Sequence, residues 1–183
     1  MNPKRKQETL EQSDLERGLG TIANMDERLD HEMNISALPV GDKAIDCSGI
    51  IQWSKNWDWG VGEIVAERLS CNSFTDWETV FVATVNQRYA ALCILEKKDA
   101  WGTDLDDALT PFITAVYVDP KFRGRRISEK LLEAACNFAR SLGFGAVYLI
   151  SGEEGLYEKF GFEKFTQTVT LLGTTEPVYI RSL

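Results

Sequence analysis

A buried strand, a short basic loop and an apolar-periodic helix follow one another between residues 111 and 142. Residues 111–120 (PFITAVYVDP) are β-branched and aromatic up to Pro120, which is typical of a buried strand. Apolar residues then recur on one helical face, and Gly143 supplies a stop signal. The residues of that face are Ile127, Leu131, Ala134, Ala135, Phe138 and Leu142. The sequence therefore predicts a strand, a loop and a helix in this order.

The loop between them carries four cations at the point where the helix begins. Lys121, Arg123, Arg125 and Arg126 lie within six positions. A helix start already presents unpaired N–H groups and the positive end of the helix dipole, so these cations predict a bound anion. Phosphate is the expected one. The alternative, that Arg125 and Arg126 are merely solvated, stays open because surface arginines are common.

The bulk composition bounds the class of protein. With 183 residues, 44% of them hydrophobic, the chain fits one globular domain with a sizeable core. The net charge of -8 argues against general nucleic-acid binding. No apolar run approaches the length of a membrane span, so we expect no membrane partner and a cytoplasmic location.

Cysteine and histidine usage gives no sign of a metal or a thiol nucleophile. The four cysteines form no CxxC pair, and His31 is the single histidine. We therefore predict no metal site and four reduced, mostly buried cysteines, at Cys47, Cys71, Cys93 and Cys136.

Residues 1–32 are polar and predict an extension outside a domain that spans residues 33–183. Within that domain the patterns predict a strand (33–40), two helices (46–57 and 60–69) and a hairpin (79–98) with its turn at Asn86-Gln87. The strand at 111 and the long helix follow, then a strand (146–151), a short helix (155–162) and a final strand pair that turns near Gly173. This order predicts an α/β fold on a mixed sheet.

Two segments resemble motifs of the GCN5-related N-acetyltransferase (GNAT) superfamily. Val118-Asp119-Pro120-Lys121-Phe122-Arg123-Gly124 is similar to the family's V-x-P-x-[YF]-R-G segment, and residues 156–162 (LYEKFGF) are similar to a later block. The resemblance implies a single α/β domain with a GNAT-like mixed, largely antiparallel sheet flanked by helices. It also implies acetyl-CoA as co-substrate, with its pyrophosphate in the loop that begins at Arg123.

The resemblance further implies the site residues. Backbone groups of Val116, Tyr117 and Val118 would pair with the amide arm of acetyl-CoA, and Tyr157 would protonate the departing thiolate. The pyrophosphate loop would consist of Arg123, Gly124, Arg125, Arg126, Ile127 and Ser128. The sequence departs from the family where Arg126 occupies the central glycine position and Ser128 the final small one. Ile150 also stands where many members place an asparagine that binds the pantetheine arm.

The sequence leaves the acceptor and the base open. The strand at 111 contains no carboxylate, so no general base is identified, although the loop acids Asp104, Asp106 and Asp107 could attract a cationic amine or be solvated. Trp53 and Trp57 are expected on one helix face as core residues, and a tryptophan there could flank an acceptor pocket.

Acetyl transfer to a primary amine of a small molecule or peptide, by direct attack in a ternary complex, is the expected activity. A non-catalytic acyl-CoA-binding or regulatory module of the same fold is the alternative. The sequence does not decide the oligomeric state, and a homodimer is compatible with it.

Overall fold

The structure, a computed structural model, describes residues 32–40, 45–75 and 77–183. The predicted N-terminal extension lies outside the described residues except for its last position. Seven strands form one sheet: β1 (Met33–Leu38), β2 (Thr79–Val85), β3 (Arg88–Glu96), β4 (Phe112–Val118), β5 (Ala146–Ile150), β6 (Glu163–Val169) and β7 (Thr175–Ser182). The helices are α2 (Ser48–Ser54), α3 (Val61–Cys71) and α4 (Ile127–Ser141), with 3₁₀ turns η1 (Pro120–Phe122) and η2 (Tyr157–Phe160).

The sheet has the strand order β1-β2-β3-β4-β5-β7-β6, in which β4 and β5 are parallel and the other neighbours are antiparallel. This confirms the predicted fold class and the predicted order of elements. The β2–β3 turn at Asn86-Gln87 is also confirmed, with φ of 50° and 63° at its two residues, as a tight hairpin turn requires.

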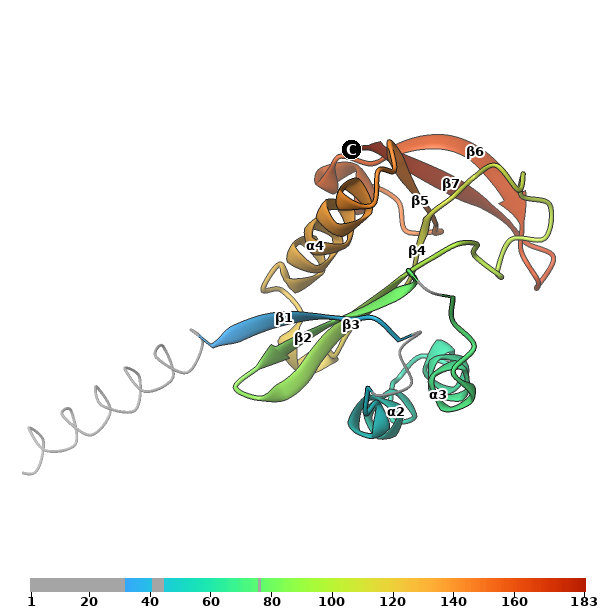
Figure 1. Ribbon diagram of the computed structural model, residues 1–183. Coiled ribbons are helices and arrows are strands. Elements are labelled where there is room, and N and C mark those ends of the chain that lie inside the picture. The colour runs from blue at the N-terminus through green and yellow to red at the C-terminus, as the bar shows by residue number, and fades with distance from the viewer. Residues whose placement is uncertain (1–31, 41–44, 76) are drawn as a thin grey trace, which may run out of the picture.

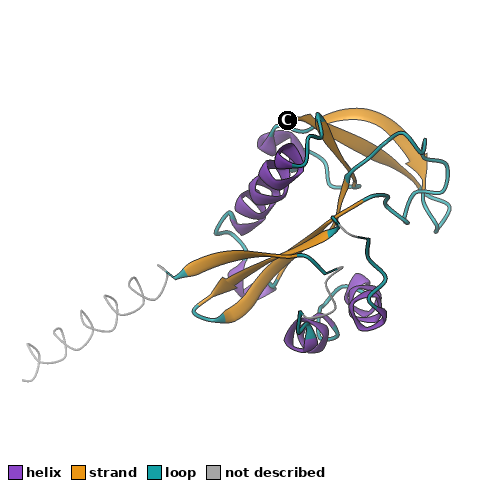
Figure 2. Cartoon of the chain, viewed as in Figure 1, coloured by secondary structure: helices purple, strands orange, loops and turns teal. Residues whose placement is uncertain are grey.

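Helices cover both faces of the sheet (Figures 1 and 2). Helix α4 packs on one face, and α2 and α3 lie on the other. The core strand β3 is buried over most of its length because it is covered on both faces. We call these the α4 face and the α2–α3 face.

The apolar face of α4 is confirmed in its centre and differs at its end. Its buried residues are Ile127, Leu131, Leu132, Ala135, Cys136 and Ala139. Leu142, which the helical period places on this face, lies just beyond the helix and is 43% exposed. The helix ends one residue earlier than the pattern indicates, so Leu142 is carried away from the sheet.

Two further expectations need correction. Cys93 and Cys136 are buried, but Cys47 is partly exposed and Cys71 is exposed, so only half of the cysteines belong to the core; all four are free thiols. Helix α2 ends at Ser54, so Trp57 lies in the following loop rather than on a helix face with Trp53. The two rings nevertheless meet edge to face, with centroids 5.1 Å apart.

None of the helices that the described residues form has the length and apolar content that crossing a membrane would require.

Candidate active site

Strands β4 and β5 part from each other soon after they begin. Within the described ladder they share the pair Phe112 and Tyr148, and the Tyr148 N–H donates to the Pro111 carbonyl at 2.9 Å. Beyond this point β4 pairs with β3 on its other side, while β5 pairs with β7. The edge of β4 that faces β5 therefore carries backbone groups without a ladder partner. We call this divergence the β4–β5 split.

A β-bulge lies in β4 beside the split. Ala115 has φ of 50°, and the register with β3 shifts between Leu92 and Ile94, so Cys93 has no partner in β4. Positive φ at a residue with a Cβ is strained, and such strain is concentrated at functional sites. Around the bulge, Ala115 packs on the α2–α3 face, where Tyr117 stacks on Trp57, whereas Val116 and Val118 pack on the α4 face.

The basic loop leads from the end of β4 into α4. After η1, Gly124 has φ of 81° and Arg126 has φ of 57° and ψ of 29°, and α4 begins at Ile127. Arg126 thus has a left-handed backbone that a glycine would adopt with less strain. No side chain caps the helix, so the N–H groups of its first turn, at Ile127 and Ser128, are available to an anion.

The arginine side chains of this loop already contact other groups of the protein. Arg123 Nε donates to the Val118 carbonyl at 2.9 Å, and its Nη2 lies 3.3 Å from Asp58 Oδ2. Arg126 Nη2 donates to Glu129 Oε1 at 2.9 Å. The Arg125 guanidinium lies 5.8 Å from the centre of the Phe122 ring. Arg123 and Arg126 would have to loosen carboxylate pairs to contact a phosphate, which these exposed pairs permit at low cost.

Tyr157 lies at the start of η2 in the core of the α4 face and is 7% exposed. Its ring packs near Phe162 and Tyr179, with centroids 6.1 and 5.8 Å away. Burial raises the pKa of Tyr157 to about 12, and Cys93, the residue opposite the bulge, adds to that rise. The phenol is therefore protonated at neutral pH, and Tyr157 shares the core of the α4 face with Cys93. Ser151, next to Ile150, uses its hydroxyl to accept the Glu153 N–H at 3.1 Å.

An aromatic cluster lies on the α2–α3 face beside β4. Tyr117 stacks on Trp57 with centroids 4.0 Å apart, and its hydroxyl donates to Asp58 at 2.9 Å. Burial, together with Asp58, raises the pKa of Tyr117 to about 12. Trp59 is 44% exposed at the edge of this cluster. Asp58 therefore joins β4, through Tyr117, to the basic loop, through Arg123.

Two buried carboxylates that the sequence analysis did not single out lie at the end of β3. Glu96 pairs with Arg68 of α3 at 2.6 Å and accepts a hydrogen bond from the Thr114 hydroxyl of β4. Asp99 is 9% exposed. Burial raises the pKa of Asp99 to about 6, and the nearby Glu96 contributes to the rise. An acid ending the apolar run AALCILE was the one available signal for Glu96.

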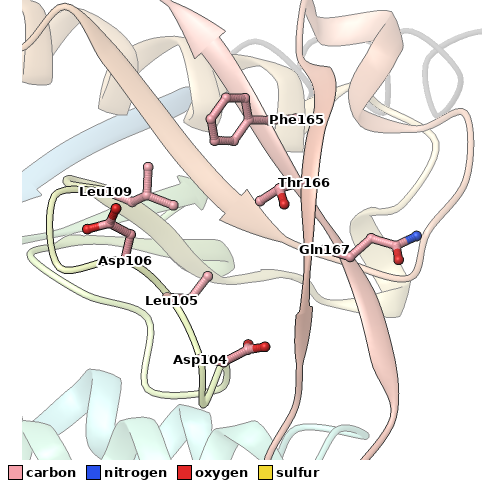
Figure 3. Close-up of a pocket in the computed structure, with 7 residues that line it drawn as sticks. All are labelled: Asp104, Leu105, Asp106, Leu109, Phe165, Thr166 and Gln167. Carbon is pink, nitrogen blue, oxygen red and sulfur yellow. The ribbon is translucent and has the colours of Figure 1, made fainter.

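The loop acids Asp104 and Asp106 line a pocket of about 340 Å³ between the β3–β4 loop and β6 (Figure 3). Asp104 accepts hydrogen bonds from the Thr168 hydroxyl and, at 3.0 Å, from the Val169 N–H. Asp106 accepts the Ala108 N–H at 2.8 Å, and Asp107 pairs with Lys98. These acids hold the loop in place, and among the described residues no His, Cys, Asp or Glu cluster is arranged to hold a metal ion.

Comparison with known proteins matches residues 76–164 to the family model of the acetyltransferase (GNAT) domain. A search of curated proteins found no match. Among solved structures, the chain resembles a proposed acetyltransferase from Exiguobacterium sp. 255-15, with a TM-score of 0.59 and 21% identity over 82% of this chain and 93% of that chain. It also resembles a GNAT family acetyltransferase from Staphylococcus aureus Mu50, with a TM-score of 0.59 and 14% identity over 82% of this chain and 99% of that chain.

A third similar structure is a GNAT family acetyltransferase from Elizabethkingia anophelis that was solved with acetyl-CoA bound. Its TM-score is 0.57, at 14% identity over 84% of this chain and 99% of that chain. At these identities the structures show a shared fold. Residues 76–164 therefore match the acetyltransferase (GNAT) domain, and the chain shares the fold of solved GNAT family acetyltransferases.

Proposed function

We propose that this protein is an N-acetyltransferase that transfers the acetyl group of acetyl-CoA to a primary amine of a small molecule or peptide. The observation that carries the proposal is the β4–β5 split with its bulge at Ala115, followed directly by the uncapped start of α4. A thioester arm in the split and a diphosphate at the helix would use both features. The structural neighbour with bound acetyl-CoA supports this choice of donor.

In this proposal the diphosphate lies against the loop of residues 123–128. The N–H groups of Ile127 and Ser128 donate to phosphate oxygens, and the Ser128 hydroxyl adds a further donor. Arg123, Arg125 and Arg126 supply positive charge, and Gly124 allows the backbone to turn. The pantetheine arm then pairs with backbone groups of Val116, Tyr117 and Val118 as an added strand.

The transfer itself requires a neutral amine, stabilisation of the negative charge that develops on the thioester oxygen, and a proton for the thiolate. A β4 backbone N–H beside the bulge stabilises the negative charge on the thioester oxygen. Tyr157 supplies the proton for the thiolate, because its hydroxyl is protonated at neutral pH. As the C–N bond forms and the C–S bond breaks, the phenol proton moves to sulfur, and a proton lost from the nitrogen restores the phenol.

The direct test is thiol release from acetyl-CoA with a panel of polyamines, amino acids, aminoglycosides and peptide N-termini. An enzyme releases thiol with at least one amine above the rate of spontaneous hydrolysis. Tight acetyl-CoA binding by calorimetry without thiol release from any amine would instead establish a non-catalytic acyl-CoA-binding module. The pair that Arg126 forms with Glu129 is compatible both with an enzyme and with a non-catalytic binding module.

Replacing Tyr157 with phenylalanine removes the proposed acid while keeping the ring. We expect kcat to fall roughly 100-fold or more, as for loss of a general acid, with acetyl-CoA affinity nearly unchanged. Tyr179→Phe is the matched control, since this hydroxyl donates to the Glu153 carbonyl at 3.3 Å and has no assigned role in the transfer. Equal kcat values for the two variants would remove Tyr157 from the mechanism.

A further inference from the structure

The loop between β3 and β4 crosses the β4–β5 split, because it joins two strands on one side of the split and contacts β6 on the other. It leaves the end of β3 where the Lys97 N–H donates to Glu78 at 2.8 Å. It then pairs with the end of β6, through the bridge between Gly102 and Thr170 and a hydrogen bond from the Thr103 N–H to the Val169 carbonyl at 2.9 Å. In the strand order, β3 precedes the split and β6 follows it, so the start of this loop lies beside both parts of the sheet.

Asp99 lies in this first part of the loop; the residue is 9% exposed, and one of its carboxylate oxygens accepts no hydrogen bond from the described residues. Oδ1 accepts the Trp101 N–H at 2.8 Å, and within the described residues the structure gives Oδ2 no hydrogen-bond donor. The charged groups that act on Asp99 are Glu96 of β3, Arg68 of α3 and Glu176 of β7. Asp99 lies between the end of β3 and the bridge of Gly102 to Thr170, in the segment that crosses from one part of the sheet to the other.

Glu96 ties this carboxylate to the reacting part of β4. Its Oε1 accepts the Thr114 hydroxyl, and Thr114 is the residue before the bulge at Ala115. Its Oε2 pairs with Arg68 at 2.6 Å, so both oxygens of Glu96 are occupied. The ion pair with α3 also places Glu96 on the α2–α3 face. Tyr157 belongs to the core of the α4 face, on the other side of the sheet.

We propose that Asp99 is the general base of the transfer, taking a proton from the ammonium form of the acceptor through Oδ2, directly or through one water. The inference rests on the proposed function. The ammonium N–H bond breaks and an O–H bond forms on Asp99, and the freed nitrogen lone pair attacks the thioester carbon. Glu96, fixed by Thr114 and Arg68, is a positioning residue. Asp99 then returns its proton to solvent, so that the reaction releases one proton overall.

The opposite faces of the two groups suit direct attack. The amine would lose its proton on the α2–α3 face, and the thiolate would receive one from Tyr157 on the α4 face. The first proton that the nitrogen loses thus goes to Asp99, and the second restores the Tyr157 phenol after it has protonated the thiolate.

The electrostatics of Asp99 also suit this role. An efficient base has a pKa near the working pH, where it is ionised yet still attracts a proton. Burial is the largest cause that raises the pKa of Asp99, to about 6 from the ordinary value of 3.8. The Trp101 N–H and Arg68 oppose this rise, and Glu96 and Glu176 add to it.

The test is the pH dependence of kcat/KM, measured as thiol release with the best primary alkylamine of the panel. With Asp99 as base, kcat/KM of the wild type rises to a plateau above about pH 6 and stays level until the amine itself loses its proton, near pH 10. Asp99→Asn keeps the acceptor for Trp101 but removes the base. In this variant kcat/KM is roughly 100-fold lower or more at pH 7 and rises in proportion to the neutral amine, without the plateau.

Methoxyamine separates a catalytic role from a structural one, because it is a neutral base at pH 7 and needs no proton removed before attack. Asp99→Asn should turn it over within about threefold of the wild type. Asp107→Asn, which changes the same charge at an exposed position of the same loop, should behave as wild type with both amines.

The outcomes are distinct. A plateau that survives in Asp99→Asn, or an equal loss with the alkylamine and methoxyamine, would overturn the role of Asp99 and leave the proposed function standing. No thiol release by the wild type with any amine would overturn the proposed function, and the base with it.

Discussion

At the scale of single residues, the features that favour chemistry at Asp99 also reduce stability. An ionised carboxylate at this buried position is held near Glu96 and Glu176, and only the Trp101 N–H and Arg68 favour its charge. Burial of a charge costs free energy unless it is paired and hydrogen-bonded. A buried acid with an unused oxygen is therefore retained against stability, as at many active sites.

This gives a prediction for Asp99→Asn in the absence of substrate. The folded state holds the Asp99 proton up to about pH 6, whereas the unfolded chain releases it near pH 3.8, so this residue lowers stability as pH rises between those values. The difference in pKa corresponds to about 3 kcal/mol as an upper figure. We expect the variant to unfold with a free energy about 1–3 kcal/mol higher than the wild type at pH 7.5, and with no gain below pH 4.

Urea unfolding at several pH values measures this difference. A variant that is less stable than the wild type at pH 7.5 would show that the ionised carboxylate stabilises the fold. Since the same variant is expected to lose activity, loss of turnover in a more stable protein cannot be attributed to unfolding.

At the scale of elements, α4 is preceded by a basic residue, Arg126, whose backbone is strained in the left-handed conformation. Arg126 has the left-handed conformation that glycine adopts most easily, and it provides no side-chain cap to α4. Its side chain instead pairs with Glu129, one turn into the helix. The arginine therefore has a backbone conformation that glycine adopts most easily, and it adds a cation beside the helix N-terminus.

The strain of the left-handed backbone at Arg126 is testable with a pair of variants that remove the same charge. Arg126→Gly relieves the left-handed strain, whereas Arg126→Ala keeps the Cβ that causes it. We expect the glycine variant to be about 1 kcal/mol more stable than the alanine variant in urea unfolding. Equal stabilities, or a more stable alanine variant, would mean that the loop relaxes to another conformation when the arginine is removed.

The elements were predictable from the sequence where local pattern determines them. The period of α4 and the Asn86-Gln87 turn depend on neighbours in the chain, so their patterns were sufficient. The site residues could be named only by resemblance, because Val116 and Tyr117 contribute backbone groups that leave no trace in residue type.

The sequence also could not single out the buried acids Glu96 and Asp99. Asp99 is not distinguished from Asp104 or Asp106 by sequence, and only the fold buries it beside Glu96 and Glu176. The contact of Arg123 with Asp58 was not predictable either, because it joins residues that lie 65 positions apart in the chain.

At the scale of the whole molecule, a single sheet is divided by the β4–β5 split into two parts that remain joined by a common core. The α4-face core contains residues from both parts, including Leu95 and Leu149, so both parts of the sheet pack into one continuous core. Two adjacent parallel strands thus diverge without a break in the domain. The account rests on the claim that a thioester donor fills this divergence.

Amide hydrogen exchange with and without acetyl-CoA tests that claim most directly. Filling the split would protect the peptide spanning residues 113–119 and the start of α4 at residues 126–130, and would leave the edge strand β1 unchanged. Acetyl-CoA binding with protection confined to other segments, or no binding at all, would contradict the account.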